Sequence, residues 1–181
     1  MSAERPVALV TGVSRVDRVG FAIARRLRRD GFDVVITSRP GGGAGRAGAV
    51  AEALRAAPGV GRVDALALDL SDLAGVERFV SSGGAVLERL DALVHNASTY
   101  ERTPLASVSA GDLEAAMRVN ALAPALLSRG FAERLSRSTM AGGGAIVAMA
   151  DIHALGEHGQ PRREMLAYAM SKAALAEMVV S

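Results

Sequence analysis

Short apolar runs alternate along the chain with longer stretches in which apolar side chains recur every three or four residues. Five runs have the length and composition of strands: Val7 to Thr11, Val34 to Thr37, Val63 to Leu70, Leu90 to His95 and Ala145 to Ala150. Continuous hydrophobicity such as that of Val34 to Thr37 is typical of strands covered on both faces. Because helical patterns lie between the runs, we predict a parallel sheet with helices on both of its faces.

The helical patterns complete a doubly wound α/β fold with three layers, α/β/α. They cover Gly20 to Asp30, Ala49 to Ala56 after a glycine-rich loop from Pro40 to Gly48, Ser71 as N-cap to about Val80, Gly111 to about Ser136 with Pro124 inside, and Met165 to Val180. Residues 151 to 163 are predicted to form a polar loop. In such folds ligands bind beyond the carboxyl ends of the strands, so the residues that follow each strand are the candidates for function.

Composition narrows the class of protein. The 181 residues suit one domain, and 50% hydrophobic with 22% charged residues is typical of globular proteins. The absence of cysteine excludes disulfides and a thiolate metal site, and we expect no metal site. No apolar run is long enough to span a membrane, so we expect a cytoplasmic protein without a membrane partner. The net charge is only +2 and the arginines are scattered, so no nucleic-acid partner is expected.

The first strand ends in a glycine turn. Thr11, Gly12, Val13, Ser14 and Arg15 follow it, and Gly20 opens the next helix. Glycines allow the backbone to approach a pyrophosphate, and a helix N-terminus offers free N–H groups to an anion. A strand, glycine turn and helix are common in α/β proteins, so this motif alone leaves dinucleotide binding and a purely structural turn both open.

The second and third strands also end in polar residues. Ser38 and Arg39 follow the second, where an acidic residue would bind the ribose of NAD and a cation would neutralise the 2′-phosphate of NADP. Arg39, together with Arg15, therefore favours NADP, against the alternative of two ordinary surface arginines. Asp69 ends the third strand, where it either contacts the adenine or caps the next helix.

The fourth strand is followed by Asn96, Ala97, Ser98, Thr99 and Tyr100, whose small members allow a cofactor to come close. Further on, Asn120 lies among good helix formers although asparagine is a poor one. A buried polar side chain needs partners, so Asn120 is a candidate for a hydrogen-bonding role.

Tyr168 and Lys172 form the strongest pattern. Four residues apart on a helix, they lie on one face, and the ammonium lowers the pKa of the phenol toward the range useful for proton transfer. The chain has 21 basic residues, of which only Lys172 is a lysine. Arginine is bulky and keeps its charge, so this position requires a compact ammonium.

In this order, these motifs resemble the short-chain dehydrogenase/reductase family over the whole chain. The resemblance implies a Rossmann fold in which the glycine turn and Asn96, Ala97 and Ser98 bind the dinucleotide. Ser38, Arg39 and Asp69 are the candidates for its adenosine end, where the charge of Arg39 favours NADPH over NADH. It implies that Tyr168 donates a proton to the substrate, that Lys172 lowers its pKa and holds the nicotinamide ribose, and that Asn120 supports a proton relay through water. It also implies a homodimer or homotetramer.

Two departures from the family pattern bear on substrate. The glycine turn has about two extra residues, near Val16 to Arg18, and Asp151 stands where the family has its catalytic serine. Asp151, with an aromatic residue at Tyr100, resembles the pteridine reductases, in which the aspartate joins the tyrosine in proton delivery and the aromatic stacks on the pterin. Ser98 would then contact cofactor or pterin.

Three functions therefore remain open. The first is an NADPH-dependent reductase that transfers hydride to a pterin C=N bond, and the second is a general 3-oxoacyl or ketone reductase. The third is a cofactor-binding module without catalysis, because the chain stops at Ser181 where family members continue. On that ground we expect residues 1–181 to form one incomplete Rossmann domain that lacks its C-terminal strands.

Overall fold

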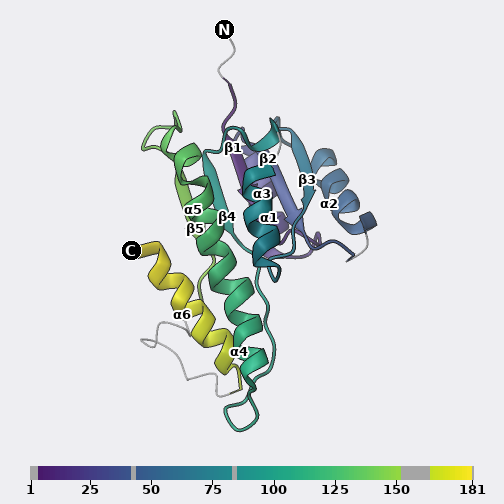
Figure 1. Cartoon of the computed structure of the whole chain (residues 1–181). Helices are drawn as coiled ribbons and strands as arrows, with labels where there is room; N and C mark the ends of the chain where they lie inside the picture. The colour runs from purple at the N-terminus through teal and green to yellow at the C-terminus, as the bar shows by residue number, and fades with distance from the viewer. Residues whose placement is uncertain (1–3, 42–43, 83–84, 152–163, 181) are drawn as a thin grey trace.

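The computed structural model describes residues 4–41, 44–82, 85–151 and 164–180. Five parallel strands form one sheet in the order β3-β2-β1-β4-β5 (Figure 1). Their bounds are Val7–Val10 for β1, Asp33–Ser38 for β2, Val63–Ala67 for β3, Ala92–His95 for β4 and Ala145–Ala148 for β5. The predicted parallel sheet is confirmed, with each strand within a few residues of its expected place.

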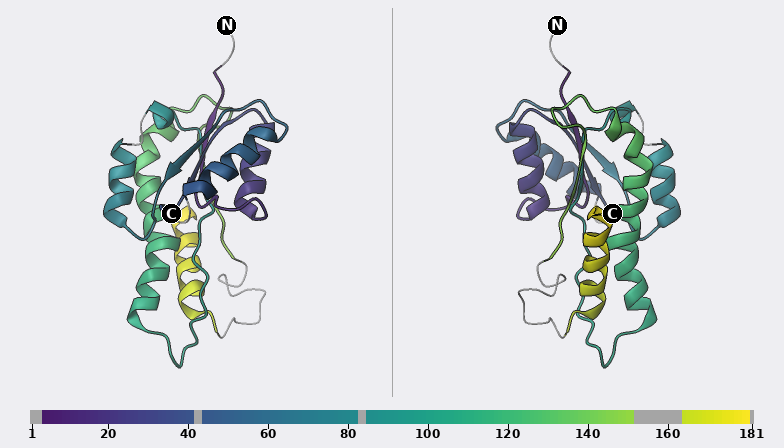
Figure 2. Two further views of the ribbon diagram at one scale, coloured as in Figure 1. Left: turned by 90° about the vertical axis from the view of Figure 1, so that its right-hand side faces the viewer. Right: turned by 90° about the vertical axis from the view of Figure 1, so that its left-hand side faces the viewer.

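Helices cover both faces of this sheet (Figure 2). On one face lie α1 (Val19–Arg29) and α2 (Ala44–Ala56), and on the other α3 (Leu73–Ser82) and α5 (Ala123–Ser136), with a short 3-10 turn, η1 (Ala85–Leu87), before β4. Neighbouring residues of a strand point to opposite faces. Leu9 accordingly belongs to the same core cluster as Phe131 of α5, and Val10 to the same cluster as Val50 of α2. The three-layer, doubly wound fold is thus confirmed.

The strand order reverses at the centre of the sheet. From β1 the chain proceeds outward to β2 and β3, then crosses back to β4, which pairs with β1 on its other side. Beyond the carboxyl ends of the strands stand α4 (Ala110–Met117) and α6 (Leu166–Val180), side by side (Figures 1 and 2). This arrangement creates the crevice in which doubly wound folds place their ligands.

The long predicted helix changes pitch in its middle. Between α4 and α5 the chain forms a π-helical turn, η2 (Arg118–Leu122), and Pro124 is the second residue of α5. Proline has no N–H, so it cannot bond the carbonyl four residues earlier, which is that of Asn120. The helix begins one residue earlier than predicted, because Ser109 forms a capping box with Asp112.

Two local predictions were wrong. The loop from Pro40 to Gly48 is shorter than expected, because α2 begins at Ala44 and its alanines favour helix over the intervening glycines. Ser71 does not cap α3, because its N–H and hydroxyl both donate to Asp69. Asp72 takes that role by accepting the N–H of Gly75 at 2.9 Å.

Strand β5 ends at Ala148 rather than Ala150 and lies at the edge of the described sheet. Ile146 and Val147 are 38% and 46% exposed, whereas the residues of β1 are buried. None of the helices in the described ranges is both long enough and apolar enough to cross a membrane. Apart from Asp151, the predicted polar loop of residues 151–163 lies outside the described residues.

Candidate active site

The glycine turn after β1 is held against the turn after β4. Gly12 has a φ of +73°, and a Cβ built on it would lie 2.6 Å from the Cα of Ala97. A Cβ on Gly20 would lie 2.5 Å from the Nδ2 of Asn96. Both positions therefore require glycine, one for its backbone conformation and its closeness to Ala97, the other for closeness alone.

Thr11 and Asn96 tie the same two turns together. The Thr11 hydroxyl accepts the N–H groups of Asn96 and Ala97 at 3.1 and 3.2 Å, and the Asn96 amide donates to the Thr11 carbonyl at 2.8 Å. Thr11 is buried, so these bonds are shielded from water. The carboxyl ends of β1 and β4 are thus locked by hydrogen bonds from residues that the sequence had singled out.

These turns fit a nicotinamide dinucleotide. Gly12 and Gly20 hold the turn close against Ala97 and Asn96, and Ser14, Arg15 and Arg18 are exposed around it. Arg18 at the start of α1 makes no side-chain cap, so the first N–H groups of that helix remain available for an anion.

The arginines expected at the 2′-phosphate lie in different surroundings. Arg15 forms a two-bond ion pair with Asp17, at 2.7 and 2.9 Å, and both side chains are about half exposed. Arg39 is exposed directly after Ser38, the last residue of β2. The pKa of Asp69 is lowered mainly by the hydrogen bond from the Ser71 hydroxyl and also by the charge of Arg39. Arg39 therefore lies over the ends of β2 and β3, whereas Arg15 is already neutralised by its neighbour.

Tyr168, Asp151 and Lys172 come together beyond β5. The Tyr168 hydroxyl donates to Oδ2 of Asp151 at 2.9 Å, across 17 residues of sequence. The Lys172 Nζ lies 5.9 Å from the centroid of the Tyr168 ring. The phenol is therefore hydrogen-bonded to a carboxylate and has an ammonium near its ring, an arrangement suited to proton transfer.

The single lysine is buried. Lys172 is 2% exposed, and its Nζ donates to the Met149 carbonyl at 2.6 Å, just past β5. Burial lowers the pKa of Lys172, and the nearby Asp151 carboxylate opposes that effect. Such a buried cation needs an adjacent anion, and the Asp151 carboxylate is nearby.

Asn120 is fully buried, as the sequence suggested for a polar residue among helix formers. Its Oδ1 accepts the N–H of Thr99 at 2.8 Å, and its Nδ2 donates to the Thr99 carbonyl at 3.0 Å and to the Ser171 hydroxyl at 2.9 Å. Both N–H groups of the amide are thus used within the protein.

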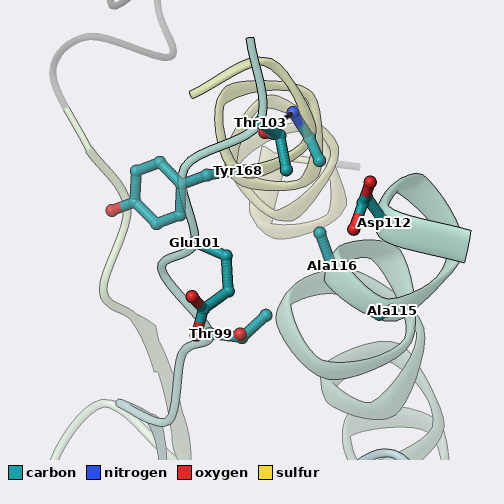
Figure 3. A pocket seen from close by; sticks show the side chains of 8 residues that line it. Thr99, Glu101, Thr103, Asp112, Ala115, Ala116 and Tyr168 are labelled. Atoms are coloured by element: carbon teal, nitrogen blue, oxygen red, sulfur yellow. Dashed lines mark hydrogen bonds between the residues drawn. The ribbon is translucent and has the colours of Figure 1, made fainter. Parts of the chain in front are cut away.

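Tyr100 lies edge-on against Tyr168, with ring centroids 4.7 Å apart and planes at 83°. Tyr100 is 52% exposed, and the hydroxyl of its neighbour Ser98 donates to the Thr99 carbonyl at 3.2 Å. Tyr168 also lines a cavity of about 50 Å³, room for one or two water molecules (Figure 3). Its lining residues are Thr99, Glu101, Thr103, Asp112, Ala115, Ala116, Ala167 and Tyr168.

Three residues of this region had no role of their own in the prediction from sequence, although Thr99 belongs to the predicted turn after the fourth strand. Thr99 and Ser171 complete the Asn120 network, and a serine beside a candidate lysine on the same helix was an available signal. His95 is 1% exposed, and its Nε2 lies 2.8 Å from the Ser128 hydroxyl while its Nδ1 has no partner in the described structure. Burial, followed by the charge of Lys172, lowers the pKa of His95 to about 4.

Comparison with known proteins supports the same interpretation. Residues 12–181 match the family model described as enoyl-(acyl carrier protein) reductase. The chain is 33% identical over 176 residues to the rhamnolipids biosynthesis 3-oxoacyl-[acyl-carrier-protein] reductase of Pseudomonas aeruginosa, covering 95% of this chain and 63% of that protein.

Solved structures agree with the fold. A metagenomic short-chain oxidoreductase in complex with NADP is 31% identical with a TM-score of 0.81, covering 97% of this chain and 73% of that one. A 3-oxoacyl-[acyl-carrier protein] reductase from Brucella melitensis in complex with NAD is 29% identical with a TM-score of 0.80, covering 98% of this chain and 66% of that one.

The matches also show how much of those proteins is represented here. The aligned regions make up 33%, 56% and 63% of three curated relatives. The family model, however, extends over nearly all of this chain, residues 12–181. The chain belongs to the short-chain dehydrogenase/reductase family.

Proposed function

We propose that this chain carries the cofactor site and proton-donating group of an NADPH-dependent reductase acting on a carbonyl substrate. The hydrogen bond from Tyr168 to Asp151, with Lys172 beside the phenol ring, carries this proposal. When bound, the dinucleotide supplies hydride to the substrate carbon. Tyr168 gives its hydroxyl proton to the carbonyl oxygen, so a C=O bond becomes CH–OH.

Each neighbouring residue has a defined part in this proposal. Asp151 accepts the Tyr168 hydrogen bond. After each turnover, a proton taken up from solvent water by the Asp151 carboxylate passes to the phenolate and restores the phenol. Lys172, held by the Met149 carbonyl, stabilises the phenolate with its charge and reaches the nicotinamide ribose. Asn120 fixes the loop before Tyr100, and a contribution to a water relay would come from its main chain, because its side-chain N–H groups are used.

Cofactor binding is assigned to the locked turns. Thr11, Gly12, Ser14, Gly20, Asn96, Ala97 and Ser98 line the approach of the pyrophosphate and nicotinamide, and Ser38, Arg39 and Asp69 lie at the adenosine end. We propose NADPH over NADH because Arg39 is exposed where the 2′-phosphate would lie. Arg39→Leu is expected to lower the ratio of NADPH to NADH affinity, and Arg15→Leu to lower it less, because Arg15 is paired with Asp17.

A pterin is the second candidate substrate, and the Asp151 contact favours it. A carboxyl group hydrogen-bonded to the phenol can relay a proton from solvent to a ring nitrogen. With hydride from the bound dinucleotide added to the carbon, C=N would become CH–NH. Tyr100 would then form one wall of the pterin site. The names of the matched 3-oxoacyl reductases favour the carbonyl candidate instead.

NADPH oxidation at 340 nm separates these candidates. The chain is assayed with a 3-oxoacyl thioester, a panel of ketones, dihydropterin and dihydrofolate. Turnover of thioesters or ketones alone supports the carbonyl reductase, and turnover of pterins alone would replace it with the pterin reductase. Binding of NADPH without turnover of any substrate would contradict both and leave a cofactor-binding module. The same preparation, run on a sizing column, tests the proposed homodimer or homotetramer.

A further inference from the structure

The two tyrosine rings of the site come from distant parts of the chain. Tyr100 lies in the segment after β4, and Tyr168 lies on α6, yet their rings meet edge to face at 4.7 Å. Edge-to-face pairs are favourable by only about 0.5–1.5 kcal/mol, so ring contact alone does not hold so exposed a residue as Tyr100 in place. Other contacts of the two segments must therefore position the rings.

The segment that contains Tyr100 is anchored at both ends. On one side, both backbone polar groups of Thr99 bond to the Asn120 amide. On the other, the Thr103 N–H donates to the Glu164 carbonyl at 2.7 Å, and its hydroxyl accepts the N–H of Ala167 at 3.1 Å. The second anchor reaches α6 directly. The first reaches α6 only through one further side chain.

That side chain is Ser171. Its hydroxyl accepts the Nδ2 of Asn120 at 2.9 Å and donates to the carbonyl of Tyr168 at 2.8 Å. A hydroxyl can donate one hydrogen bond, and the Ser171 hydroxyl donates it to the backbone carbonyl of Tyr168, the candidate proton donor. The chain of bonds therefore runs from Thr99 through Asn120 and Ser171 to Tyr168.

Burial makes each of these hydrogen bonds costly to lose. Asn120 and Ser171 are both 0% exposed, so water cannot replace a lost partner. The Thr99 N–H fixes which end of the amide is oxygen, which in turn directs an N–H at Ser171. Removing the Ser171 hydroxyl would leave a buried amide N–H unpaired, at a cost larger than the bond itself is worth.

We propose that Ser171 is a positioning residue for Tyr168. Joined to Asn120 and through it to Thr99, its hydroxyl fixes the phenol of Tyr168 relative to Tyr100 and Asp151. Ser171 touches neither substrate nor cofactor in this role. The proposal takes from the proposed function only the identity of Tyr168 as the group to be positioned.

The composition of the chain allows a direct test without substrate. The protein has two tyrosines and no tryptophan, so in a Tyr100→Phe background the absorbance rise at 295 nm on raising the pH reports Tyr168 alone. Phenylalanine keeps the ring that packs against Tyr168. The Ser171→Ala change is made in this background, and circular dichroism at each pH confirms that the protein is folded.

We expect Ser171→Ala to move the titration midpoint of Tyr168 by about half a pH unit or more from that of its parent. The phenol would no longer be held at fixed distances from the Asp151 carboxylate and the Lys172 ammonium. Ser171→Cys, which keeps the shape but bonds weakly, should shift the midpoint in the same direction. Ser171→Thr, which keeps the hydroxyl, should restore it.

Ser136→Ala is the matched control. The Ser136 hydroxyl makes the same kind of bond, to the carbonyl of Glu133 three residues earlier at 2.8 Å, but on the exposed side of α5. It should leave the midpoint unchanged. An equal midpoint for Ser171→Ala and its parent would overturn the proposal. Loss of folding in both Ser171→Ala and Ser171→Cys would also overturn it, because the serine would then support the fold rather than the phenol.

The readout is independent of turnover. If no substrate is reduced but the midpoint shifts as expected, the proposed function fails and the positioning role stands. If a substrate is reduced, Ser171→Ala should lower kcat about tenfold or more with little change in KM for NADPH, since small displacements of reacting groups cost much rate.

Discussion

The glycine turn and the tyrosine helix are built by opposite means. At the glycine turn, close approach of the backbone sets the structure, because Gly12 and Gly20 lie too near Ala97 and Asn96 for either to carry a Cβ. The surrounding side chains of Ser14 and Arg15 are exposed. Around α6, buried side chains set the structure, because Asn120, Ser171 and Lys172 are each at most 2% exposed. The first region is suited to accept a polyphosphate of fixed shape. The second is suited to hold a few atoms at fixed distances.

The largest expected effect is on the rate of the reductase, when the hydroxyl of Tyr168 on α6 is removed. Tyr168→Phe removes the hydroxyl that bonds Asp151 but keeps the ring that meets Tyr100. We expect kcat of the reductase to fall about 10²- to 10⁴-fold, the usual contribution of a positioned proton donor. Binding of NADPH, followed by its fluorescence, should be unchanged. A variant that keeps its rate would remove Tyr168 from the chemistry.

His95 tests the electrostatics of the buried region. Its pKa is lowered from 6.5 to about 4 by burial and the charge of Lys172, so the unfolded chain binds the proton more readily. Its contribution to stability is therefore complete above about pH 6.5 and is lost as the pH falls toward 4.

This loss should amount to about 2–3 kcal/mol between pH 7 and pH 4.5, measured by urea unfolding. Other groups titrate in the same range, so the quantity to compare is the difference between wild type and His95→Asn. That difference should change with pH over this window. A constant difference would show that His95 titrates in the folded protein as it does in the unfolded one.

Gly12→Ala should affect binding rather than chemistry. A Cβ at φ +73° costs about 1–2 kcal/mol, and here it also meets the Ala97 backbone. NADPH affinity is expected to fall about tenfold or more, with kcat at saturation little changed. Gly31→Ala is the control, since Gly31 also has a positive φ, +98°, but no neighbour within 4 Å. Equal losses of NADPH affinity in both variants would show that the close approach of Gly12 to Ala97 does not matter for binding.

The smallest effect is expected at the exposed ion pair of the turn. Asp17→Asn frees Arg15 for the 2′-phosphate of NADPH, and the affinity ratio of NADPH to NADH should rise by at most about fivefold, because exposed charges are well screened. Asp30→Asn breaks a similar surface pair, with Arg26 at 2.7 Å, and serves as the control. An unchanged ratio would mean that Arg15 does not reach the phosphate.

Much of the glycine-turn region was predictable, because its requirements are local. A strand of Val7 to Val10 followed by Gly12 and Gly20 can be identified from hydrophobicity and from the special backbone of glycine. The Tyr168 and Lys172 pair could be identified for a related reason, since four residues of helix place both side chains on one face.

The buried network was only partly predictable. The sequence pointed to Asn120 as a polar residue in need of partners, but Thr99 lies 21 residues before it and Ser171 lies 51 residues after it. No periodicity connects such positions. Arg15 and Asp17 are only two residues apart. Even so, neither secondary-structure propensity nor the hydrophobic pattern indicates that Arg15 would pair with Asp17 rather than stay available for a ligand.

By itself, then, the sequence determined the order of strands and helices, the turn that only glycine can form, and the tyrosine and lysine on one helical face. These features depend on backbone propensity and on short spacings. The tertiary structure alone decided that Asp151 meets Tyr168, that Asn120 and Ser171 join the two tyrosine-bearing segments, and that His95 is buried near Lys172. Such contacts arise only when the sheet brings distant strand ends to the same edge, where burial makes each unpaired polar group costly.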